Sequence, residues 1–84
     1  MVRYRIKLRK FEEVIDVPEH IRGLRNVAHY ITEYLADRYA KSLAPAEDHK
    51  KVKHLKEVYY LSHIDVITQL LMDYAEKVKR EMGL

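Results

Sequence analysis

Hydrophobic and polar residues alternate along the first nine positions of the chain. The even positions from 2 to 8 are apolar, and the odd positions from 3 to 9 are all cationic. Successive side chains of a β-strand point to opposite faces, so this period of two predicts a strand with one apolar face and one basic face. The apolar positions are Val2, Tyr4, Ile6 and Leu8.

A second strand is predicted over residues 11–17, because apolar residues again share one parity there. If the two segments form a hairpin about Arg9 and Lys10, opposite charges meet across the basic face, which favours this register. The predicted cross-strand pairs are Leu8 with Phe11, Tyr4 with Ile15, Val2 with Val17, Lys7 with Glu12, and Arg3 with Asp16. Two features oppose the register: the turn lacks Gly or Asn, and Glu13 would share the apolar face with Ile6.

From Ile21 onward the apolar spacing changes from two residues to three or four, which is typical of an amphipathic helix. We predict a helix over residues 19–43. Pro18 suits a first helical position, and Glu19 places negative charge at the positive end of the helix dipole. Pro45 ends this helix, because it disfavours helical backbone at the residue before it.

The second helical region, residues 46–82, allows two interpretations. Ser62 with Asp65 has the form of a capping box, flanked by the two apolar positions of a hydrophobic staple, which favours a break at 61–62 and a new helix there. No proline or glycine interrupts the region, however. The alternative is therefore a single helix about 55 Å long.

Together these elements predict one α+β domain over residues 1–84 that is mostly helical, with an N-terminal β-strand or β-hairpin (1–17) followed by two or three antiparallel helices. A two-stranded hairpin is marginal on its own in water, so its apolar face must lie on the helices or its edge must pair with a second copy. A chain of this length also buries only a small core. We therefore expect a homodimer.

Composition narrows the class of protein without identifying its activity. Charged residues make up 35% of the chain, and Asn26 and Gln69 are the only side-chain amides, a balance typical of proteins from hot environments. The lack of cysteine excludes disulfides, thiolate zinc sites and cysteine nucleophiles. Since no apolar run reaches the roughly 18 residues of a membrane span, we expect a cytoplasmic protein with no membrane partner.

The side chains that most often carry catalysis or bind metals do not form a site in the sequence. The five histidines lack the spacings of a zinc site. The contiguous Ser62, His63 and Asp65 splay outward at a helix start instead of converging as a triad. We therefore predict no enzymatic activity, no catalytic residue, no metal ligand and no cofactor.

Two short stretches resemble known families. Arg22 and His29 in "RGLRNVAH" are similar in spacing to the Arg-x(4–6)-His signature of the HEPN ribonucleases, whose paired Arg and His cut RNA across a dimer interface. This resemblance covers eight residues and implies an RNA-cutting enzyme as a third functional hypothesis. "EVIDVPEHIRGL" resembles the opening of ribbon-helix-helix DNA-binding proteins, whose strands pair across a dimer. The Gly-x-Ser corner of that family is missing.

Basic clusters give the strongest functional signal. Residues 1–10 hold five cations and no acid. In "HKKVKHLK", His49, Lys53 and Lys56 share one helix face, with Tyr60 next along it. Cations in such a row can follow phosphates, and a neighbouring tyrosine can stack on an exposed base.

We therefore predict a small non-enzymatic accessory protein that binds DNA or RNA through backbone phosphates with little sequence preference. Within the hairpin, we expect Glu12 to form an ion pair with Lys7 and Asp16 to form one with Arg3. The remaining cations near the hairpin tip are then free. The predicted nucleic-acid-binding residues are Arg5, Arg9, Lys10, Lys50, Lys53 and Lys56. The alternative is a protein-interaction or assembly subunit that acts through a helical homodimer interface.

Overall fold

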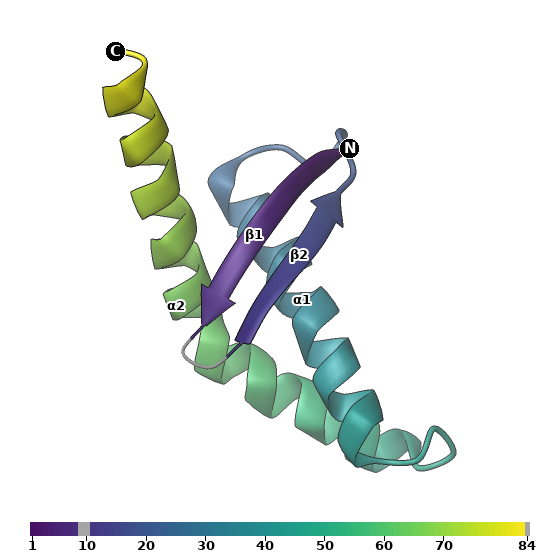
Figure 1. The fold of residues 1–84 in the computed structure, drawn as a ribbon. Coiled ribbons are helices and arrows are strands. Elements are labelled where there is room, and N and C mark those ends of the chain that lie inside the picture. Colours follow the sequence, from purple (N-terminus) through teal and green to yellow (C-terminus); the bar gives the residue numbers. More distant parts are fainter. Residues whose placement is uncertain (9–10, 84) are drawn as a thin grey trace.

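The fold consists of a β-hairpin that lies across a pair of antiparallel helices (Figure 1). A computed structural model describes residues 1–8 and 11–83. The elements are β1 (Val2–Leu8), β2 (Phe11–Val17), α1 (Leu24–Leu43) and α2 (His49–Glu81). The predicted α+β class, with an N-terminal hairpin followed by helices, is confirmed. Two helices follow the hairpin, and the described residues form no third one.

The hairpin has the register that the sequence predicts. β1 and β2 pair antiparallel, with Val2 opposite Val17 and Leu8 opposite Phe11. Ile6, Ile15 and Val17 are buried under the sheet, so the apolar face lies on the helices. The ribbon-helix-helix arrangement is not formed, because β1 pairs with β2 of the same chain.

Glu13 faces Ile6 across the hairpin, as the register requires, and it is the one acid on the inner face of the described strands. Its carboxylate is not left without a partner. Glu13 Oε2 accepts a hydrogen bond of 2.7 Å from Arg38 Nη1 of α1. This ion pair ties β2 to α1 at the edge of the core and explains how an acid is accommodated beside apolar neighbours.

The prediction that the first helix begins at residue 19 is wrong, because α1 begins at Leu24. Pro18 lies in a turn instead of a first helical position, and its carbonyl accepts a hydrogen bond of 3.0 Å from the Ile21 amide. The chain then enters the helix through Gly23, which has φ of 90° and ψ of 142°. Residues other than glycine rarely adopt that backbone conformation. Residues 19–23, which the sequence pattern assigned to the start of the helix, therefore form the connection that reverses the chain between β2 and α1.

The favoured break at 61–62 is also absent, because α2 is one helix of 33 residues. Ser62 is not an N-cap: its hydroxyl donates to the Val58 carbonyl at 2.8 Å, within the helix. The N-cap of α2 is Asp48, whose side chain accepts from the Lys51 amide at 3.1 Å. Figure 1 shows that α2 changes direction near its middle without interruption, so that its C-terminal half turns alongside the hairpin.

The core is formed where the hairpin and both helices meet. Its most buried large side chains include Ile15 from β2, Ile31 from α1 and Ile67 from α2, all no more than 2% exposed. Burying one such side chain stabilises the fold by about 1.5–3 kcal/mol. Towards the other end of the helix pair, Tyr59 stacks on His63 with ring centroids 4.0 Å apart and contacts Tyr39 at 5.0 Å. The core thus follows the helix pair and ends where α1 begins.

Candidate phosphate-binding groove

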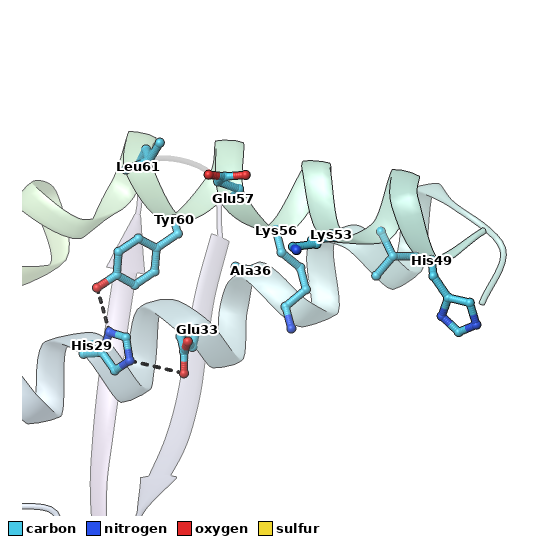
Figure 2. Close-up of a pocket in the computed structure, with 10 residues that line it drawn as sticks. His29, Glu33, Ala36, His49, Lys53, Lys56, Glu57, Tyr60 and Leu61 are labelled. Carbon is cyan, nitrogen blue, oxygen red and sulfur yellow. Dashed lines mark hydrogen bonds and ion pairs between the residues drawn. The ribbon is translucent and has the colours of Figure 1, made fainter. Parts of the chain in front are cut away.

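A groove of about 540 Å³ runs between α1 and the first half of α2 (Figure 2). We call it the helix groove. α1 contributes His29, Glu33 and Ala36 to its walls. α2 contributes seven residues: His49, Val52, Lys53, Lys56, Glu57, Tyr60 and Leu61. In Figure 2 the two strands pass behind the helices, and no described residue of the hairpin lines the groove.

The structure brings together the helix face that the sequence singled out. His49, Lys53, Lys56 and Tyr60 all line the helix groove. They do so because α2 is helical throughout this stretch, so that spacings of four, three and four residues keep them on one side. Lys50 is not among the lining residues, and it lies one helical turn before Lys53 on α2.

Lys56 is already engaged within the molecule. Its Nζ lies 3.4 Å from Asp37 Oδ1, and Lys41 Nζ lies 2.9 Å from the other oxygen of the same carboxylate. The hydrogen bond from Lys41, together with the charge of Lys41 and the contact with Lys56, holds the pKa of Asp37 below its usual value against a smaller opposing effect of burial. Lys50 and Lys53 form no ion pair with any residue that the structure describes. Of the three α2 lysines predicted to bind phosphates, these two are therefore the more available to a ligand.

His29 and Tyr60 join the walls of the groove. His29 Nδ1 and Tyr60 Oη share a hydrogen bond of 2.7 Å, and the two rings meet edge to face at 5.4 Å. On its other side, His29 Nε2 lies 3.4 Å from Glu33 Oε2. Sequence reasoning missed this contact, because His29 and Tyr60 are 31 positions apart and no local pattern links them. For the second contact, between His29 and Glu33, the sequence does offer a signal, because the two residues lie one helical turn apart.

The cations of the hairpin are arranged differently from the prediction. Arg3 Nε pairs with Asp16 Oδ1 at 3.0 Å, as the register suggests. Lys7 lies opposite Glu12, as the register predicts. The expected ion pair between them is wrong, since Glu12 Oε1 lies 3.1 Å from Arg5 Nε instead. A diagonal neighbour across a hairpin lies within reach of a long side chain such as arginine. Arg5, predicted to be free for phosphate contacts, is therefore held by a carboxylate.

Arg9 and Lys10, the other two cations predicted at the hairpin tip, lie outside the described residues. The structure thus leaves the predicted binding set divided. Lys53 and Lys56 line the helix groove, and Lys50 lies one helical turn before Lys53. Arg5 lies on the exposed face of β1 and lines a different pocket, beside the C-terminal half of α2.

The residues that suggested chemistry do not assemble into a site. Arg22 precedes α1 and its Nε donates to the Glu19 carbonyl at 3.3 Å, so it does not share a helix with His29. His63 bonds to the Tyr59 carbonyl at 2.9 Å within α2, not to Ser62. No group of three or more potential metal ligands occurs among the described residues. In the same part of the chain, neither helix combines the length and the hydropathy needed to cross a bilayer.

No protein-family model, no curated protein and no solved structure matches this chain.

Proposed function

We propose that the protein is a non-enzymatic accessory that binds DNA or RNA through backbone phosphates, using the first half of α2. The observation that carries this proposal is that Lys53 and Lys56 line the helix groove beside Tyr60, with Lys50 one helical turn before Lys53. Ammonium groups of this kind attract phosphates without reading base sequence. The aromatic ring of Tyr60 offers an apolar surface beside them on which a base can stack.

The proposed binding surface is confined to α2, because carboxylates neutralise the described arginines of the hairpin. Arg3 and Arg5 are each paired with an acid, so releasing them to a phosphate would expose a carboxylate to the same phosphate. Lys50 and Lys53 form no ion pair with a described residue, so a phosphate can bind them without breaking one. The predicted contribution of Arg5 is therefore small in comparison with that of the α2 lysines.

The test is the salt dependence of binding to labelled single-stranded and duplex oligonucleotides, followed by fluorescence anisotropy. Each phosphate contact contributes about 0.7 to 0.9 to the slope of log affinity against log salt. For the double variant Lys50→Ala/Lys53→Ala we expect weaker binding and a slope that is smaller by about 1.5. Binding should fall steeply as salt rises in the wild-type protein.

The matched control is Arg3→Ala/Lys7→Ala, which removes the same charge from the exposed face of β1, outside the helix groove. It should leave the slope within experimental error of the wild type. Equal losses in the two double variants would show that only net charge matters, which contradicts the assignment to the helix groove. Absence of binding at low salt would contradict nucleic-acid binding altogether.

A further inference from the structure

The apolar stripe of α2 extends further along the helix than the elements that cover it. Ile67 and Leu71 face the core and are nearly inaccessible to solvent. The next positions at the same helical spacing are Tyr74, Val78 and Met82. Val78 is half-buried, whereas Tyr74 is 61% and Met82 67% exposed. We call Tyr74, Ala75, Val78 and Met82 the C-terminal stripe. An apolar face that continues at the same spacing beyond its partner needs another partner.

No further part of α1 can cover the C-terminal stripe. α1 runs antiparallel to α2 and begins at Leu24, where Gly23 turns the chain away towards β2. Figure 1 shows the last turns of α2, in yellow, extending beyond both the hairpin and α1. At this end, an apolar groove of about 410 Å³ is lined by Tyr4, Leu24, Val27 and Leu71 together with Tyr74, Ala75 and Val78.

The surface area of the chain supports a missing partner. A folded monomer of 10.1 kDa exposes about 5,300 Å². This chain exposes 6787 Å². The excess of about 1,500 Å² is larger than the roughly 800 Å² that each partner buries in a standard protein interface. The radius of gyration, 14.3 Å, is likewise greater than the roughly 12 Å expected for a compact domain of this length.

The charge around the C-terminal stripe indicates what kind of partner fits. Residues 73–83 carry three acids and three bases, so the segment has no net charge. A polyanion such as nucleic acid gains nothing from such a surface. Two copies of the segment, in contrast, can approach one another without net repulsion, and acids of one copy can meet bases of the other.

We propose that the partner is a second copy of this chain. The last turns of α2 from two copies cross antiparallel about a two-fold axis near Val78, and each copy places Tyr74 and Val78 against the apolar groove of the other. Such an interface is isologous, since the same patch is used on both sides. It lies at the opposite end of α2 from the lysines of the helix groove, so it stands independently of the proposed nucleic-acid binding.

The first test is the mass in solution, measured by light scattering across a range of protein concentrations. The wild-type chain should have about twice the mass of 10.1 kDa. Val78→Lys should reduce the mass to that of one chain, because it places two like charges near the axis. Met72→Lys is the matched control: it adds the same charge to the same helix at a position that is 43% exposed and outside the C-terminal stripe, and it should remain dimeric.

A complementary pair of variants separates loss of the interface from loss of folding. Val78→Glu alone should also be monomeric, and mixing it with Val78→Lys should restore the dimer mass, because the two side chains meet near the axis as opposite charges. The helical circular dichroism of each variant reports whether it is folded. A wild-type mass of one chain at all concentrations, or a dimer that survives both substitutions, would overturn the proposal. Either result leaves the salt dependence of the α2 lysines as a separate question.

Discussion

At the scale of single residues, the pairing of charges decides which cations remain available. The alternating pattern of β1 correctly predicts a row of cations on one face of a strand. The acids on β2 then neutralise Arg3 and Arg5 individually, at 3.0 and 3.1 Å. Asp37 does the same for Lys41 and, at longer distance, for Lys56. A count of basic residues therefore overestimates the surface that can attract an anion.

Substitution of Asp37 by Asn tests this pairing. Because the pKa of Asp37 is lowered in the folded protein, its carboxylate stabilises the fold above its pKa in the unfolded chain, near 3.9, and this stabilisation is lost as the pH falls through the lower folded pKa. At neutral pH we expect Asp37→Asn to lower the free energy of urea unfolding by at most about 1 kcal/mol. The difference from the wild type should shrink below about pH 4. A difference that stays constant into acid would contradict the ion pairs.

At the scale of elements, α2 continues as one helix across a stretch whose sequence favours an N-cap. Ser62, His63 and Thr68 each bond to the carbonyl four residues earlier, at 2.7 to 2.9 Å. Such bonds compete with the helical ladder and often bend a helix. We attribute the change of direction in the middle of α2 to these bonds. It turns the C-terminal half of α2 alongside β1 (Figure 1).

Removal of the Ser62 hydroxyl distinguishes a helix interior from a cap. An N-cap serine replaced by alanine costs about 0.5–2 kcal/mol. Since Ser62 lies inside α2 and bonds to Val58, we expect Ser62→Ala to change the free energy of unfolding by less than about 0.5 kcal/mol. Asp48→Ala removes the real cap and should cost about 1 kcal/mol in the same urea titration. Equal losses in the two variants would contradict the continuous helix.

At the scale of the whole molecule, the elongated shape is the feature that most needs an explanation. A hairpin and two helices enclose a core around Ile15, Ile31 and Ile67, yet the end of α2 projects beyond it. Dimerisation through the C-terminal stripe would complete that core and place two helix grooves on one particle. Two grooves on one particle would strengthen binding to a long nucleic acid through a higher effective concentration.

Thermal unfolding provides the corresponding prediction. If folding and dimerisation are coupled, the midpoint of unfolding depends on protein concentration by mass action. For a chain of this length we expect a rise of a few degrees for each tenfold increase in concentration, roughly 4 °C. In Val78→Lys the midpoint should no longer depend on concentration. A wild-type midpoint that is constant over a hundredfold range would argue against coupled assembly.

The sequence by itself determined the features that follow from backbone periodicity. Alternation with a period of two defined β1, and its pairing with the apolar and charged positions of β2 defined the register, including Glu13 opposite Ile6. Spacings of three and four residues defined the helix face that carries Lys53, Lys56 and Tyr60. These features are predictable because each depends on residues within one element or within one hairpin.

Only the tertiary structure decided the rest. The Ser62 cap signature is worth about 1 kcal/mol, and packing of Tyr59 and Ile67, which lie on either side of Ser62, on the core outweighs it. Arg5 forms an ion pair with Glu12, and His29 forms a hydrogen bond with Tyr60. Both contacts depend on distances in space that the order of residues along the chain does not give. The sequence likewise does not show that α2 extends beyond the elements that pack on it at the C-terminal stripe. Its apolar spacing continues without a break and does not indicate where the covering helix, α1, begins.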